Sequence, residues 1–99
     1  MKNILFVCSL GMSTNMFVSK MVKSAKGMNY DANIWASSDI NVEENLEKAD
    51  IILLAPQVRY LSQKIKKLVN DKKPILIVDI EDYSKMNSKK VLEQCIDIN

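Results

Sequence analysis

Short apolar runs alternate with longer amphipathic segments along this chain, and this alternation constrains the fold more than any other feature. Lys2–Cys8 and Ile51–Ala55 are nearly continuous apolar runs, which is typical of strands buried on both faces. Strands that alternate with helices form βαβ units on a parallel sheet. The sequence therefore predicts an α/β domain in which one sheet carries helices on both faces. Its four parallel strands are expected at Lys2–Cys8, Ala32–Ser37, Ile51–Ala55 and Ile75–Val78.

The strands differ in pattern, and the differences predict their places in the sheet. Apolar and polar residues alternate over Ala32–Ser37, as expected of an edge strand with one face partly wet. Ile51–Ala55 has no polar residue and is expected at the centre.

Four segments have the spacing of amphipathic helices. The first begins at Ser13 or Thr14 and ends near Gly27, a plausible C-cap. A short acidic helix follows Asp39 or Asn41 and runs through Leu46. The third starts at Pro56 and continues to Val69, and the last begins at Ser84 or Asn87. The first helix has an apolar stripe made of Phe17, Val18, Met21, Val22 and Ala25.

Length and composition indicate one soluble globular domain covering residues 1–99. The chain is 47% hydrophobic and 26% charged, close to the average for such domains. No run approaches the length of a membrane span, and the first apolar run is too short for a signal peptide, so we expect a cytoplasmic protein that does not itself span a membrane. Neither a long apolar patch nor a heptad is evident, which favours a monomer.

Charge and composition exclude several kinds of function. The net charge of +2 is spread over isolated lysines, which is not the footprint of a nucleic-acid binder. The chain has no histidine, so it contains no Cys-His pair and no histidine-ligated metal. Cys8 and Cys95 lack the spacing of zinc ligands. We therefore expect neither a metal nor another cofactor, and any histidine in the chemistry must come from a partner.

The segment from Cys8 to Thr14 predicts an anion site. It connects the end of a buried strand to the start of a helix, where backbone N–H groups can surround a phosphate and favour a thiolate. In parallel sheets, ligands bind at the carboxyl ends of the strands. Gly11 allows a close backbone approach, and Ser9, Ser13 and Thr14 add hydroxyls. The alternative is a small buried cysteine followed by an ordinary turn.

The same loop carries no charge from Ser9 to Met16. An arginine there would clamp the oxygens of a transferring phosphoryl group and favour turnover by hydrolysis. Neutral donors alone suit a carrier that holds phosphocysteine better than they suit a phosphatase.

The Cys-x-x-Gly-Met-Ser-Thr segment, the strand before it and the later Leu54-Ala55-Pro56-Gln57-Val58 resemble the IIB component of the bacterial phosphotransferase system, lactose/cellobiose type. The resemblance spans nearly the whole chain and implies a single IIB-type domain with a Rossmann-like, phosphatase-like fold. It also implies that Cys8 accepts phosphate from a phosphohistidine on a IIA component. The acceptor would be a sugar bound by a IIC membrane permease, namely a β-linked disaccharide such as cellobiose, chitobiose or lactose. The implied phosphate loop is Ser9, Leu10, Gly11, Met12, Ser13, Thr14 and Asn15, and the Leu10 side chain is assigned no role of its own.

Two alternatives have the same general architecture. Low-molecular-weight tyrosine phosphatases carry a Cys-x5-Arg signature, but Thr14 stands where the arginine would be. Their general acid could be Asp79, Glu81 or Asp82, although these residues are better explained as solvated or capping residues. The other alternative is a noncatalytic flavodoxin-like binding domain.

Four further residues are assigned less firmly. Gln57, Tyr60 and Tyr83 follow strands and either border the site or serve as capping and surface residues. Cys95 belongs to the apolar face of the last helix and is expected in the core.

Overall fold

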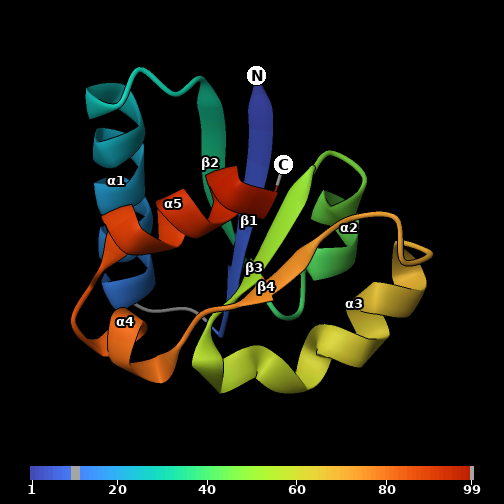
Figure 1. Cartoon of the computed structure of the whole chain (residues 1–99). Helices are drawn as coiled ribbons and strands as arrows, with labels where there is room; N and C mark the ends of the chain where they lie inside the picture. The colour runs from blue at the N-terminus through green and yellow to red at the C-terminus, as the bar shows by residue number, and fades with distance from the viewer. Residues whose placement is uncertain (10–11, 99) are drawn as a thin grey trace.

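The computed structural model describes residues 1–9 and 12–98, and within them four parallel strands form one sheet (Figure 1). The strand order is β2-β1-β3-β4. This confirms the predicted sheet, including β2 at an edge and β3 in the interior. The strands are β1 (Lys2–Cys8), β2 (Ala32–Ser38), β3 (Ile51–Leu54) and β4 (Ile75–Ile77).

Burial explains why the two inner strands are continuous apolar runs. Ile4, Leu5, Phe6 and Val7 of β1 are fully buried, and so is every residue of β3. Side chains of a strand alternate between the two faces of a sheet, so both faces around these strands must be covered. Removal of this apolar surface from water is the main driving force for the fold.

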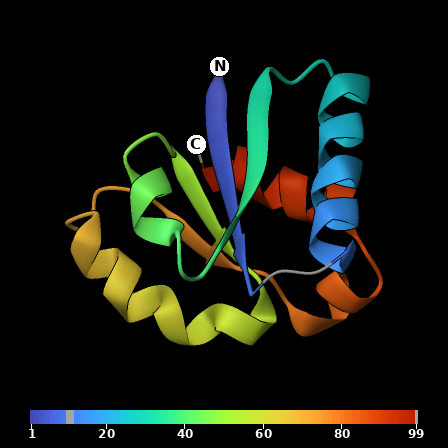
Figure 2. The same cartoon turned by 180° about the vertical axis from the view of Figure 1, so that it is seen from behind.

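Helices cover both faces, as predicted. Opposite views show α1 (Met12–Gly27) and α5 (Ser88–Ile98) on one face, and α2 (Val42–Leu46) with α3 (Ser62–Leu68) on the other (Figures 1 and 2). The 3₁₀-helix η1 (Pro56–Leu61) and α4 (Ile80–Ser84) follow the carboxyl ends of β3 and β4. No helix within residues 1–9 and 12–98 is long and apolar enough to cross a membrane.

The end of α1 corrects the expected role of Gly27. Gly27 lies inside the helix and has no positive φ, whereas Asn29 has a φ of 55°. The Tyr30 N–H donates to the Ala25 carbonyl at 2.8 Å, and the Asn29 N–H donates to the Lys26 carbonyl at 3.1 Å. These two bonds define a Schellman motif with Asn29 as its left-handed residue. Asparagine tolerates this conformation better than most residues because its side chain is short and polar.

Two other helix predictions need correction. The segment from Pro56 to Val69 is not one α-helix, because it begins with the 3₁₀-helix η1, which is kinked at Val58 (φ −116°, ψ 21°), and α3 starts only at Ser62. Ser84 does not start the last helix. It ends α4, a five-residue helix that the sequence pattern did not predict, and α5 begins at Ser88.

The strand order places Cys8 where ligands bind in this class of fold. β1 lies between β2 and β3: the chain runs from β1 to β2 on one side and then crosses over to β3 on the other side, where the strand order reverses. Ligands bind beside this reversal, at the carboxyl ends of the strands. Cys8 is the last residue of β1 and lies opposite Ser38 of β2, and the neighbouring Val7 lies opposite Leu54 of β3.

The Schellman motif at Asn29 makes a stability prediction. Asn29→Ala should lower the free energy of unfolding by about 1 kcal/mol, because alanine disfavours the left-handed conformation. Asn29→Gly should be at least as stable as the parent protein. Urea unfolding measures both, with Lys26→Ala as a control on an exposed position of α1. Equal stability of Asn29→Ala and the parent protein would contradict this account.

Candidate functional site

Cys8 ends β1 at the carboxyl edge of the sheet, where it pairs with Ser38 of β2. Its side chain is buried, at 4% exposure. On the other side of β1, the N–H of Ala55, just after β3, donates to the carbonyl of the preceding residue, Val7, at 2.9 Å. The thiol therefore sits on rigid backbone at the point where β1 ends.

The start of α1 supplies hydrogen-bond donors close to Cys8 in the sequence. The N–H groups of Met12, Ser13 and Thr14 belong to the first turn, where the helix offers no carbonyl partners. The positive end of the helix dipole lies at the same place. Thr14 is buried at 1% exposure, whereas Ser9, Ser13 and Asn15 are exposed. The predicted ligands Leu10 and Gly11 lie outside the described residues.

Tyr83 joins this site from the far end of the chain. Its hydroxyl lies 3.7 Å from Cys8 Sγ, 3.2 Å from Ser13 Oγ and 3.3 Å from Thr14 Oγ1. The sequence left its role open between a site residue and a surface residue. The structure brings it together with Cys8, Ser13 and Thr14. An aromatic residue with a polar end, just after the last strand of a parallel sheet, is the signal that could have identified it.

The Tyr83 ring is fixed by aromatic packing. Its centroid lies 5.5 Å from that of Phe17 and 6.2 Å from that of Phe6, in stacked arrangements. Tyr83 itself is only 8% exposed. The ring therefore belongs to the core while its hydroxyl reaches the site, as buried tyrosines commonly do.

The backbone of α4 determines where Tyr83 lies, and the acidic residues of this segment stabilise that helix. Asp79 is the N-cap, and its carboxylate accepts from the Glu81 N–H at 2.8 Å. The Glu81 carboxylate pairs with Lys85 at 2.8 Å. The capping interpretation is thus confirmed for Asp79.

Asp82 corrects the expectation that this residue is solvated. It is 5% exposed, and its Oδ1 accepts from Asn87 Nδ2 at 3.0 Å and from Lys90 Nζ at 3.2 Å. The hydrogen bond from Asn87 is the main cause that lowers the pKa of Asp82, with burial opposing it and Lys90 adding to it. Asp82 therefore connects α4 to α5 as a carboxylate.

Gln57 and Tyr60 differ in their position relative to Tyr83. Gln57 lines a cleft of about 260 Å³ together with Pro56, Arg59, Ile80, Tyr83 and Ser84, so it borders the site through Tyr83. Tyr60 is exposed and does not line this cleft, and its hydroxyl donates to Asp39 at 3.3 Å.

Cys95 lies in the core, as predicted. It is fully buried in α5, and burial raises the pKa of its thiol to about 12. A thiol kept protonated in this way is a poor nucleophile.

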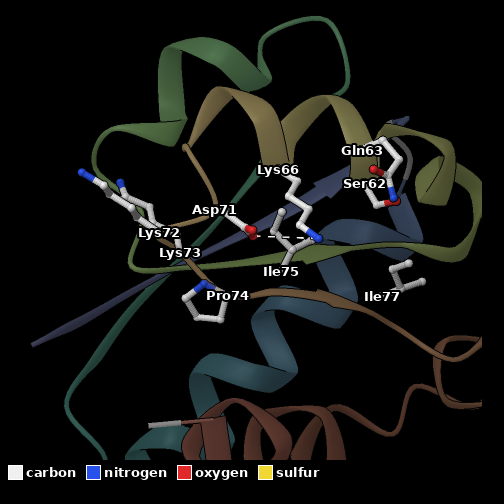
Figure 3. A pocket seen from close by; sticks show the side chains of 9 residues that line it. All are labelled: Ser62, Gln63, Lys66, Asp71, Lys72, Lys73, Pro74, Ile75 and Ile77. Carbon is white, nitrogen blue, oxygen red and sulfur yellow. Dashed lines mark ion pairs between the residues drawn. The ribbon is translucent and has the colours of Figure 1, made fainter.

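Another hollow lies between α3 and β4 (Figure 3). Its volume is about 390 Å³, and an exposed ion pair of 3.9 Å joins Lys66 and Asp71 on its wall. Exposed ion pairs contribute little energy, and none of the lining residues is fully buried. This hollow therefore lacks the buried polar groups that are typical of a ligand-binding site. Its lining is Ser62, Gln63, Lys66, Asp71, Lys72, Lys73, Pro74, Ile75 and Ile77.

By geometry, the molecule is an α/β domain with a cysteine thiol beside a helix N-terminus, an arrangement in which anions bind. Residues 3–94 match the family model for the lactose/cellobiose-specific IIB subunit of the phosphotransferase system. The chain belongs to this family, whose members are phosphotransferases that work with IIA and IIC partners. This match does not favour the tyrosine phosphatase alternative.

Individual relatives agree with the family assignment. The oligo-beta-mannoside-specific EIIB component of Bacillus subtilis is 33% identical over 99% of this chain and 96% of that protein. The cellobiose-specific and galactose-specific EIIB components of two Lactococcus lactis strains are each 35% identical, over 92% of this chain and 90% of each relative.

Solved structures are similar in fold. The solution structure of the cellobiose-specific IIB component from Borrelia burgdorferi is 39% identical and has a TM-score of 0.78, over 97% of this chain and 89% of that one. The lactose-specific IIB domain from Streptococcus pneumoniae has a TM-score of 0.84 over 97% of this chain and 95% of that one. At 16% identity it shows the shared fold alone.

The Asp82 contacts predict a pH-dependent stability effect. The lowered pKa means that ionised Asp82 stabilises the fold above its ordinary pKa of 3.8, and that this contribution is lost as the pH falls through the lowered value. Asp82→Asn should therefore unfold at lower urea concentration than the parent protein at neutral pH, and the difference should shrink on acidification. Asp97→Asn, at an exposed position of α5, is the control. A difference that stays constant with pH would show that charge is not the cause.

Proposed function

We propose that this protein is the phosphoryl carrier of a sugar phosphotransferase system. In this proposal Cys8 accepts a phosphoryl group from a phosphohistidine on a IIA component and passes it to a sugar bound by a IIC permease. The observation that carries the proposal is the position of the Cys8 thiol, at the end of β1 beside the first turn of α1 and the Tyr83 hydroxyl. The family of the chain supports the same assignment.

The first transfer moves the phosphoryl group from IIA to Cys8, so the nucleophile and the phosphoryl donor are on different proteins. The Cys8 thiolate attacks phosphorus in line, so that an S–P bond forms while the P–N bond to the partner's histidine breaks. The histidine nitrogen leaves with the electron pair of that bond. This division of roles fits a chain that has no histidine.

The loop from Ser9 to Asn15 is proposed to hold the phosphoryl group, with backbone N–H groups as the main ligands. The described part of this loop supports the assignment, because the first-turn N–H groups of α1 lack carbonyl partners within the helix. The hydroxyls of Ser13 and Thr14 lie on the same turn and already contact Tyr83. All these donors are neutral, which suits storage of phosphocysteine better than its hydrolysis.

In the second transfer, a sugar hydroxyl oxygen attacks phosphocysteine and the S–P bond breaks, which returns Cys8 to the thiolate. The hydroxyl proton passes to a base of the permease or to water. We propose a β-linked disaccharide such as cellobiose, chitobiose or lactose as the acceptor. Similar relatives are named for oligo-beta-mannoside, cellobiose and galactose. Such variety at similar identity is expected if the permease selects the sugar.

Partner docking at the carboxyl edge of the sheet is supported by exposed apolar side chains on the segments that follow the strands. Ile40 is 86% exposed after β2, Tyr60 is 67% exposed in η1, and Ile80 is 70% exposed at the start of α4. Large apolar residues exposed around a reaction site are typical of an interaction surface. We propose that IIA covers this edge during transfer.

Phosphorylation of Cys8 tests the proposed function directly. The protein is mixed with phosphoenolpyruvate, the general phosphotransferase proteins and a cognate IIA, and its intact mass and modified residue are determined. A phosphate-sized increase on Cys8 that depends on IIA is expected. Cys8→Ser should show none at neutral pH, because a serine hydroxyl is far less ionised than a thiol.

Two outcomes would contradict the proposal that this protein is a phosphoryl carrier. Phosphoryl relay that persists in Cys8→Ser would place the accepting group elsewhere. Hydrolysis of p-nitrophenyl phosphate through Cys8, without any adduct from IIA, would favour a phosphatase.

The docking proposal predicts a selective effect at Ile80. Ile80→Gln removes apolar contact area from the proposed surface and should raise the KM for phospho-IIA about tenfold, since a buried aliphatic side chain contributes about 1.5 kcal/mol or more. Thermal stability should not change, because Ile80 is exposed. Leu68→Gln is the matched control on α3, before the start of β4. Equal KM values for the two variants would exclude Ile80 from the interface.

A further inference from the structure

Three hydroxyl or thiol groups converge on the Tyr83 hydroxyl, and this convergence restricts the directions of the hydrogen bonds. Cys8 Sγ, Ser13 Oγ and Thr14 Oγ1 lie 3.7, 3.2 and 3.3 Å from it. A phenolic hydroxyl donates one hydrogen bond and can accept others, whereas a thiolate can only accept. When Cys8 is a thiolate, all three contacts are made if Tyr83 donates to sulfur and accepts from Ser13 and Thr14.

The hydroxyl is held in this place by the rest of the fold. Stacking on Phe6 and Phe17 orients the ring. The Asp79 cap and the Tyr83 N–H bond to the Asp79 carbonyl, at 2.9 Å, hold the backbone of α4. A donor fixed before the reaction costs little reorganisation when charge develops on its acceptor.

We propose that Tyr83 is a positioning residue that donates its hydroxyl hydrogen to the Cys8 thiolate and so supports the nucleophile of the carrier. The proposal rests on the proposed function, in which Cys8 is that nucleophile. Ser13 and Thr14 direct the donation toward sulfur by occupying the acceptor positions of the phenol oxygen. Loss of the hydroxyl therefore leaves less thiolate and a less well oriented sulfur.

Charged groups on the neighbouring elements make other contacts. Asp39, after β2, accepts from Tyr60, and Lys90 of α5 pairs with Asp82 of α4. On α4, Glu81 pairs with Lys85, and its N-cap Asp79 accepts from the helix backbone. Arg59 of η1 lines the cleft that Tyr83 borders, and the first turn of α1 has no acidic residue. Among the described residues, Tyr83 is thus the side chain hydrogen-bonded to Cys8 Sγ.

Alkylation of Cys8 by iodoacetamide over a range of pH tests the hydrogen bond without any partner protein. Tyr83→Phe keeps the ring and its stacking but removes the donor. The rate-against-pH curve should move to higher pH, and the rate at neutral pH should fall by up to about tenfold, the scale of a hydrogen bond to a charged acceptor. At high pH, where the thiol is ionised in both proteins, the variant should react at least as fast as the parent protein, because a thiolate without the hydrogen bond is at least as nucleophilic. Mass mapping assigns the label, and buried Cys95 should contribute little.

Tyr30→Phe is the matched control, because it removes a tyrosine hydroxyl from the connection between α1 and β2, at the edge of the sheet opposite to Cys8. Its alkylation curve should coincide with that of the parent protein. Coincidence of the Tyr83→Phe curve with the parent curve would overturn the proposal, because a structural role of the ring alone would not move it.

Phosphoryl transfer from phospho-IIA gives the second readout. Tyr83→Phe should lower kcat with little change in KM, whereas a raised KM at unchanged kcat would overturn the positioning role in favour of partner binding. Absence of any phosphocysteine in the parent protein would refute the proposed function instead, and it would do so independently of the alkylation result.

Discussion

Pairing of β1 with strands on both sides is the interaction on which the rest of this molecule depends. Four consecutive residues of β1, from Ile4 to Val7, are fully buried, and their register with β2 and β3 leaves one position for Cys8. A slip by one residue would exchange the two faces of the strand, so that each side chain would have to fit a space shaped for its neighbour. The position of the thiol is therefore a consequence of core packing. The candidate site at Cys8 is rigid because the sheet is rigid.

Sequence patterns were sufficient for the parts of the fold that repeat regularly. The strands and α1 have strong periodicities, and burial of their apolar residues agrees with the expected faces. The short α2 was expected from its cap position and acidic residues, but the equally short α4 was not predicted. A five-residue helix such as α4 has too few residues for a period, and it depends on the Asp79 cap and on contacts from Asp82 to α5. Likewise, the choice of Asn29 over Gly27 as the left-handed residue depends on where α1 ends.

The candidate site was predictable only in part, for a similar reason. Cys8 and the first turn of α1 are neighbours in sequence, so a local pattern relates them. Tyr83 lies 75 positions from Cys8, and its contact requires the complete sheet, the direction of α4 and the stack on Phe6 and Phe17. The sequence pattern predicted that Tyr83 follows the last strand, but it could not predict what its side chain contacts.

The two cysteines of the chain lie in different environments. Both are buried, so exposure alone does not distinguish them. Cys95 lies in the apolar core of α5, where burial raises its pKa to about 12. Cys8 lies beside helix N–H groups and the phenolic hydroxyl of Tyr83, none of which carries a formal charge. Under the proposed function this neutrality has a direct consequence. A site that stabilised phosphate with fixed cations would hold it too tightly to return it, whereas neutral donors allow the next acceptor to take it.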